Sequence, residues 1–147
     1  MTSYGVRGGK NPTKEFWPIQ CHVPKAGVLD ANGADIDRYR NGGYFALTFM
    51  LLPGVWTDGT HAFILEEADD SGSNTAGTYA AVAAADVLGG VSGTFVSITA
   101  ATTTIQRIDY IGRKRWVRCR YDYTAGSTGA LFSVVALLFS PSIFPAA

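Results

Sequence analysis

The sequence predicts an all-β protein, an antiparallel β-sandwich or barrel of jelly-roll type with about six to eight short strands. Three observations lead to this prediction. Apolar and polar residues alternate with the period of two that is typical of strands. Turn-forming residues recur about every 8–12 residues, and no segment has convincing helical periodicity. A chain of 147 residues is long enough for one domain with a buried core.

The first half of the predicted sandwich contains two strands joined by a tight turn. Residues 44–52, YFALTFMLL, are apolar on both faces, so this strand is expected to lie between two layers or in an interface. Pro53-Gly54 is expected to end it. Asp58-Gly59 then predicts a tight turn, and HAFILEE at 61–67 predicts the second strand. The polar residues 68–77, ADDSGSNTAG, are expected to form a loop.

The second half contains one segment in which a helix competes with a strand. The alanines of residues 78–90, TYAAVAAADVLGG, favour a helix, but the helical periodicity is poor, and an edge strand followed by a turn is predicted. Strands are also predicted for GTFVSITA at 93–100 and for TTTIQRIDYI at 102–111. The apolar segment 130–139, ALFSVVALLF, predicts the last strand, which Pro141 closes.

The N-terminal segment is predicted to be an extended arm, because glycines and prolines interrupt any regular period in it. Phe16, Trp17 and Ile19 are apolar enough to dock this arm on a partner. The predicted organisation is an arm at 1–30, a single β-sandwich domain at 31–140 and a C-terminal tail at 141–147.

A basic stretch at residues 113–118, RKRWVR, contains four cations. We interpret it first as the turn and return strand of a β-hairpin with a solvated, charged tip. A protein-binding surface is the second interpretation, because Arg and Trp are frequent interface anchors. Its candidate residues are Phe16, Trp17 and Ile19 from the arm and Arg113, Lys114, Arg115, Trp116 and Arg118 from the basic stretch. Nucleic-acid binding is least favoured, because 12 Lys+Arg are balanced by 12 Asp+Glu and phosphate binding needs a basic excess.

Alternation in the predicted hairpin assigns its side chains to two faces. Val117 and Cys119 are expected to point toward the core, and Arg118 is expected to point outward. Arg107 and Asp109 on the preceding strand are expected to lie across from the charges of the return strand, where opposite charges stabilise strand pairing.

The sequence contains no pattern of a known active site. His22 and His61 belong to no metal-binding spacing, and nucleophile and phosphate-loop motifs are absent. We therefore expect no enzymatic activity, no cofactor and no metal. The acidic run at 66–70, with neighbouring Ser and Asn oxygens, offers ligands for Ca²⁺, but its spacing matches no EF-hand, and a solvated loop is the favoured interpretation.

The two cysteines, Cys21 and Cys119, lie far apart and form no CxxC pair. Reduced thiols are expected, with a disulfide within or between chains as the alternative. No apolar run is long enough to span a bilayer. The N-terminal residues MTSYGVRGGKNP lack the apolar region of a signal peptide, so synthesis and retention in a cytosol-like compartment are expected.

Three segments in this order carry a resemblance to a known group of proteins: DGTHAFILEEADD at 58–70, AAVAAADVLGG at 80–90, and YIGRKRWVRCRYDYTAGSTGALFSVVALL at 110–138. They resemble small virion head proteins of tailed bacteriophages and prophages, called capsid decoration, cement or stabilisation proteins. In that group a TDGTHTFxLEESDDG strand precedes an AAADxLG segment and YIGxKRYVRV. The resemblance covers roughly residues 35–139, and neither motif is catalytic. Cys119 stands where a small β-branched residue is expected, which leaves room for a disulfide specific to this chain.

The resemblance implies a structural protein that binds the outside of an assembled phage capsid and stabilises it. The implied partners are the major capsid protein and further copies of the chain, in a homo-oligomer for which a trimer is expected. It implies a place on the capsid exterior of the virion after synthesis in the host bacterial cytoplasm, with no specific nucleic-acid or membrane binding. Two alternatives stay open: another phage component (tail tube, head-completion protein or fibre), or a β-sandwich that binds carbohydrate or a host surface through aromatic residues such as Trp56, Tyr79 and Trp116.

Overall fold

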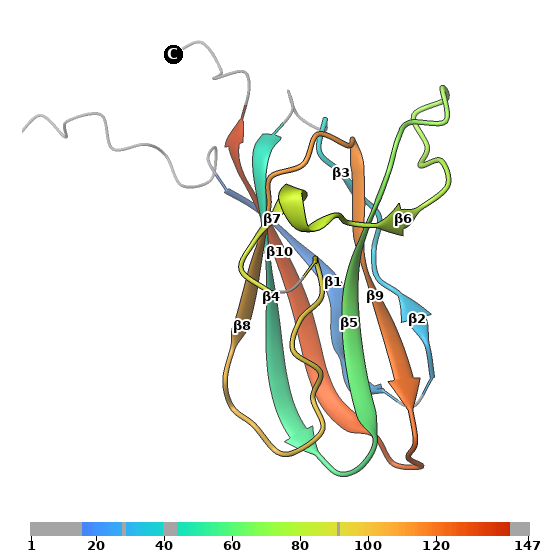
Figure 1. The fold of residues 1–147 in the computed structure, drawn as a ribbon, viewed down its shortest axis with the longest axis vertical. Helices are drawn as coiled ribbons and strands as arrows, with labels where there is room; N and C mark the ends of the chain where they lie inside the picture. Colours follow the sequence, from blue (N-terminus) through green and yellow to red (C-terminus); the bar gives the residue numbers. More distant parts are fainter. Residues whose placement is uncertain (1–15, 28, 40–43, 91, 142–147) are drawn as a thin grey trace, which may run out of the picture.

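The computed structural model describes residues 16–27, 29–39, 44–90 and 92–141, and it shows a sandwich of two antiparallel sheets (Figure 1). The first, sheet A, has the strand order β1-β10-β4-β8-β7; the second, sheet B, has the order β2-β9-β5-β6, with β3 also paired to β9. The strands are β1 Phe16–Gly27, β2 Ala31–Asn32, β3 Ile36–Asp37, β4 Tyr44–Trp56, β5 Thr60–Ala68, β6 Ala80–Ala81, β7 Val87–Leu88, β8 Gln106–Tyr110, β9 Trp116–Thr124 and β10 Ala130–Pro141. The predicted all-β sandwich is confirmed.

Aromatic side chains from both sheets form the centre of the core. The ring of Phe132 on β10 lies 4.6 Å from the ring of Tyr121 on β9 and 4.7 Å from that of Phe63 on β5, measured between centroids. His61 is fully buried beside them, with Nδ1 2.8 Å from the Tyr121 hydroxyl and Nε2 2.9 Å from the carbonyl oxygen of Asp58. The buried imidazole therefore has polar partners on both nitrogens, as burial of a polar group requires.

Strand β4 is apolar on both faces, as predicted. Leu47, Phe49 and Leu51 are fully buried between the sheets, whereas Met50 lies on the outer face and is partly exposed. The prediction that Pro53-Gly54 ends the strand is wrong, because β4 continues to Trp56. Pro53 is paired with Phe132 next to a register shift at which β4 has one extra residue, and a proline is tolerated at such a bulge because a ladder hydrogen bond is already interrupted there.

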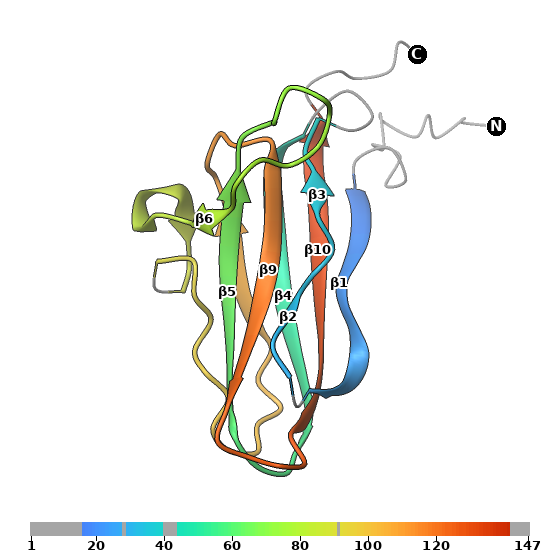
Figure 2. The same ribbon diagram turned by 90° about the vertical axis from the view of Figure 1, so that its right-hand side faces the viewer.

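Part of the segment predicted to be an arm is an edge strand of the sandwich. Strand β1 pairs with β10 along sheet A (Figure 2), so residues 16–27 belong to the sandwich, which was expected to begin at residue 31. Two prolines obscured this strand in the sequence, yet Pro18 and Pro24 suit an edge, where one side of the strand needs no N–H donor. Residues 1–15 of the arm and 142–147 of the tail lie outside the described residues.

The predicted hairpin between β8 and β9 is wrong. Strand β8 pairs with β4 in sheet A and β9 pairs with β5 in sheet B, so residues 111–115 cross from one layer to the other. Both strands still point their apolar side chains into the same core, and alternation alone does not distinguish a hairpin from a crossover. As a result Arg107 and Asp109 do not face β9; they pair with each other on the outer face of sheet A.

The segment between β5 and β8 is less regular than predicted. Residues 78–90 form β6, a 3₁₀ turn at Ala84–Asp86 and β7, in agreement with the predicted edge strand and turn. Residues 93–100 do not form a strand and make only two isolated bridges to β5. Phe95 and Ile98 are both buried, and a spacing of three residues between inward side chains is incompatible with the alternation of a regular strand.

Candidate functional site

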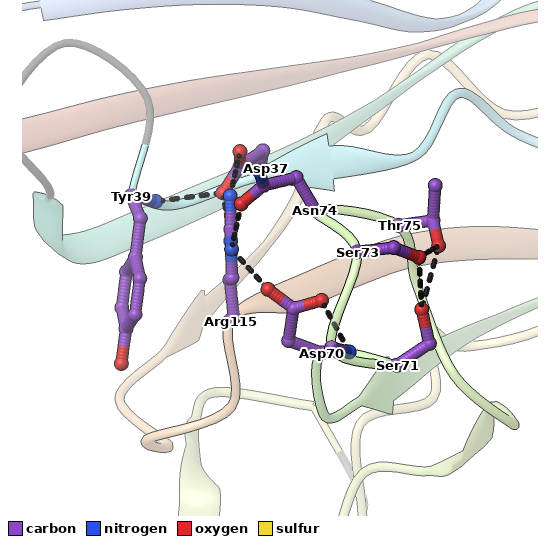
Figure 3. A network of polar contacts seen from close by, with 9 residues as sticks. Asp37, Tyr39, Asp70, Ser71, Ser73, Asn74, Thr75 and Arg115 are labelled. Atoms are coloured by element: carbon purple, nitrogen blue, oxygen red, sulfur yellow. Dashed lines mark hydrogen bonds and ion pairs between the residues drawn. The ribbon is translucent and has the colours of Figure 1, made fainter.

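The basic stretch and the acidic run are brought together at one end of sheet B, where they neutralise each other. The centre of this cluster is Arg115 (Figure 3). Its guanidinium binds Asp37 on β3 through two hydrogen bonds of 2.9 Å, and it also contacts the carboxylate of Asp70 and the side-chain oxygen of Asn74. The hydrogen bonds that Arg115 donates to Asp37 raise the pKa of its guanidinium. The same guanidinium binds Asp37 through two hydrogen bonds and also contacts Asp70, so it holds the loop after β5 against β3.

Two further cations of the stretch are paired in the same way. Lys114 binds the carboxylate of Asp69, and the Nε of Arg118 donates to Glu66 at 2.8 Å. The guanidinium carbon of Arg118 also lies 3.9 Å from the ring centroid of Tyr79, a close cation–π contact. Arg113 is exposed and makes no ion pair within the part of the chain that the structure describes. The stretch therefore presents little unpaired positive charge to a partner.

The acidic run is accordingly not a free set of oxygen ligands. Glu66 is bound by Arg118, Asp69 by Lys114 and Asp70 by Arg115. In the described ranges no group of three or more His, Cys, Asp or Glu side chains is placed to hold a metal ion. The sequence shows both charged runs, but their mutual neutralisation depends on the pairing of β5 with β9.

Arg38 is a buried residue of this cluster that the sequence does not single out. Only 5% of its surface is exposed, and its Nη1 donates to the carbonyl oxygens of Gly112 at 2.7 Å and of Lys114 at 2.8 Å. Burial lowers the pKa of its guanidinium. The Tyr110 ring centroid lies 4.9 Å from its guanidinium carbon, and the Tyr110 hydroxyl donates to Glu67 at 2.6 Å. Arg38 thus fixes the crossing segment 111–115 from inside.

At the opposite end of the sandwich, Asp58 connects the β4–β5 turn to the β9–β10 connection. Its carboxylate accepts hydrogen bonds from the backbone amides of Ser127, Thr128 and Gly129 at 2.6–3.1 Å. These amides, those of Ser127 and Gly129 foremost, lower the pKa of Asp58 to about 2 from an ordinary 3.8. Gly59 follows with a φ of +85°, a conformation that a side chain would strain. The turn predicted from Asp58-Gly59 is confirmed.

Removal of this carboxylate is expected to reduce stability in a pH-dependent way. The folded state lowers the pKa of Asp58, so its contribution is complete above about pH 4 and is lost as the pH falls toward 2. Asp58→Ala should therefore lower the Tm at pH 7, and the difference from the wild type should shrink by pH 2. Thermal unfolding across this range measures it, with Thr57→Ala as the neighbouring control. A difference that is constant from pH 7 to pH 2 would contradict this role.

The two cysteines are free thiols inside the core. Burial raises the pKa of Cys21 to about 12 and raises that of Cys119 well above its ordinary value. Because the thiolate is the reactive form, both are poor nucleophiles. Gly33 packs closely against the backbone of Cys119. Its amide donates to the carbonyl oxygen of Cys119, and a Cβ at Gly33 would lie 2.6 Å from that oxygen.

The predicted interface residues do not form one surface. Phe16, Trp17 and Ile19 lie on β1 of sheet A, and Arg113–Arg118 belong to the crossing segment and to β9 of sheet B. Trp17 is 37% exposed, whereas Ile19 packs against the core. The rings considered for sugar stacking are also engaged: the guanidinium carbons of Arg118 and Arg115 lie 3.9 Å from the Tyr79 centroid and 5.2 Å from the Trp116 centroid.

The outer faces of the two sheets differ in chemistry. The outer face of sheet B carries an ionic ladder: Glu66 of β5 pairs with Arg118 and Arg120 of β9, and Arg120 also pairs with Asp122. The outer face of sheet A is apolar over β4 and β10. We call this surface the apolar face, and its β4 and β10 residues are Ala46, Met50, Leu52, Leu131, Val135, Leu137 and Phe139, with Thr48 and Ser133 among them. No described strand packs over it.

No family model, curated protein or solved structure matches the chain. In the described ranges no helix is long and apolar enough to cross a membrane. A hollow of about 370 Å³ beside residues 96–106 is lined by apolar, Ser, Thr and Gln side chains without a charged group.

Proposed function

We propose that this chain is a structural protein of a tailed-phage virion that binds the outside of the assembled capsid and stabilises it. The observation that carries the proposal is the contrast between the paired charges of sheet B and the uncovered apolar face of sheet A. A contiguous apolar surface on a folded protein is typical of a protein-binding site. The resemblance of residues 58–70, 80–90 and 110–138 to capsid decoration proteins suggests two kinds of protein partner, the capsid and further copies of this chain.

The residues that carry the resemblance have structural roles, which supports a shared scaffold. In the TDGTH part, Asp58 holds the β9–β10 connection and His61 is buried in the core. In the YIG part, Tyr110 binds Glu67 of the FILEE segment. A Cβ at Gly112 would lie 2.5 Å from the Tyr110 hydroxyl, so any other residue here would have to displace the Tyr110 ring.

The proposed mechanism is stabilisation by preferential binding. A protein that binds the assembled shell and not its free subunits shifts the equilibrium toward the shell. Many copies at equivalent positions multiply a modest contact energy. The proposed partners are the major capsid protein and further copies of this chain, on the exterior of the virion, and the role requires no enzymatic activity, nucleic acid or membrane.

The test is co-sedimentation with expanded capsids assembled from the major capsid protein encoded with this chain. We expect the protein to sediment with expanded shells, to be absent from the fraction of free subunits, and to raise the temperature at which the shells break. The matched control is the same mixture with unassembled capsid protein. Absence of the protein from the shell fraction would reject the capsid role. Rings or tubes formed by the protein alone in negative-stain microscopy would favour a tail or head-completion component instead.

A further inference from the structure

The apolar face is a continuous part of sheet A. Outward side chains of β10 and β4 lie next to each other in the register, Val135 beside Met50 and Ser133 beside Leu52. Their inward neighbours, such as Val134 and Leu51, are fully buried, which confirms that the partly exposed set points away from the core. On the β1 side, Pro18 extends the face next to Leu137.

Among the side chains of this face that the structure describes, charge is confined to one margin. Arg107 and Asp109 on β8 lie next to Met50 and Thr48 in the register, and they form an ion pair with each other. Thr48 is buried and donates a hydrogen bond to Asp109. Any partner must therefore be flat and apolar over β4 and β10, and must carry matching charges of both signs over β8.

A second copy of the chain meets both requirements. We propose that the apolar face is the docking surface for a second copy of this chain, in a twofold pair with the two A sheets stacked face to face. The register places Ala136, Phe49 and Ile108 at one level across the sheet. A twofold axis that lies in the interface at this level, perpendicular to the strands, sets each strand against its own copy.

This axis sets the charged residues of β8 against opposite charges of the second copy. Arg107 and Asp109 lie one residue on either side of Ile108, so the axis brings Arg107 of one copy opposite Asp109 of the other. The same operation brings Val135 opposite Leu137 of the second copy. An axis parallel to the strands would instead set Arg107 and Asp109 against Gln20 and Pro18 on the β1 side, neither of which carries a charge.

The size of the face fits a reversible pair. The face spans four strands spaced about 4.8 Å apart, or roughly 19 Å. It is about 30 Å long along residues 131–139 of β10 but only about 17 Å long along the 5 residues of β8, at about 3.3 Å per residue. Two such faces bury on the order of 800–1,100 Å², around the lower limit of about 1,000 Å² for a specific interface. We therefore expect a pair that forms with rising protein concentration. The pair covers the apolar face, so the capsid of the proposed function would be bound through other surfaces of the paired protein. The pair is tested on the purified chain alone, so its failure and the failure of the capsid role are distinguishable.

Sedimentation velocity over a range of concentrations tests the proposal on the full chain. The wild type should shift from monomer to dimer. Val135→Asp places a charge at the centre of the face and should raise the dissociation constant at least tenfold. Val96→Asp is the matched control, because Val96 is 70% exposed on the segment beside β5, outside the face; it should associate like the wild type. Thermal unfolding of each variant shows whether it is folded.

A charge exchange tests the orientation without altering the apolar residues. Arg107→Glu should weaken the pair several-fold, because it sets like charges opposite each other, and the double variant Arg107→Asp/Asp109→Arg should restore association. A wild type that stays monomeric at every concentration would overturn the proposal, as would a dimer that persists in Val135→Asp. A threefold oligomer, the number expected from the resemblance, would overturn the twofold pair. A double variant as weak as Arg107→Glu would overturn the proposed axis.

Discussion

Phe132→Ala is expected to lower the free energy of unfolding by about 3–5 kcal/mol, the usual cost of removing a buried aromatic side chain. The Phe132 side chain is 1% exposed and lies where the two sheets meet, with Tyr121 and Phe63 within 5 Å between ring centroids. Urea denaturation at neutral pH measures the loss.

The matched control for this substitution is Phe139→Ala, on the same strand but on the outer face, where the side chain is partly exposed. Its effect on the unfolding free energy of the monomer should be less than half as large, because the removed surface is already in contact with water. Equal losses for the two variants would show that the cluster around Phe132 is not the centre of the core.

Arg38→Met is expected to lower the free energy of unfolding by about 1–3 kcal/mol. The substitution leaves the carbonyl oxygens of Gly112 and Lys114 without this buried donor, and each unsatisfied group costs about 1–3 kcal/mol. Removal of a buried charge offsets part of that cost, because the guanidinium no longer has to be desolvated. The result is a loss smaller than the sum of two broken hydrogen bonds.

Arg113→Met, in the crossing segment 111–115 that Arg38 contacts, is the control for Arg38→Met. Arg113 is exposed, and its replacement should change the unfolding free energy by no more than about 0.5 kcal/mol. Denaturation curves of the two variants decide the point. If both variants were as stable as the wild type, Arg38 would have no part in fixing segment 111–115.

The sequence predicts the long strands well because their two faces differ or are both apolar. Alternation identifies β5 and β9, and the apolar residues of β4 and β10 identify two strands that are covered on one face and leave an apolar surface on the other. Alternation shows which residues point inward, but it does not show which strand lies next to which. The sequence therefore predicts a hairpin where the chain crosses from β8 to β9. The prolines of β1 interrupt its pattern, so the sequence predicts an arm there.

For the candidate site, too, the sequence shows the local patterns but not the contacts between distant segments. Both charged runs are visible in the sequence, and Arg118 is correctly directed outward. Their pairing is not visible, because Asp37 and Arg38 come from the short strand β3 and its end, a region with no strand signal. Contacts between residues 78 positions apart, such as Arg115 with Asp37, depend on the packing of the layers and not on any local pattern.

The pairing of β1 with β10 determines how the molecule would respond to force. Phe16, at the start of β1, lies opposite Phe139, near the end of β10, so the chain enters and leaves the sandwich at one corner of sheet A. A pull on the two termini would open the ladder one hydrogen bond at a time, since antiparallel bonds lie across the strands. Peeling of this kind resists little load. A tether through the termini would therefore be mechanically weak, and a protein that reinforces a pressurised wall with this fold has to receive the load through its broad faces.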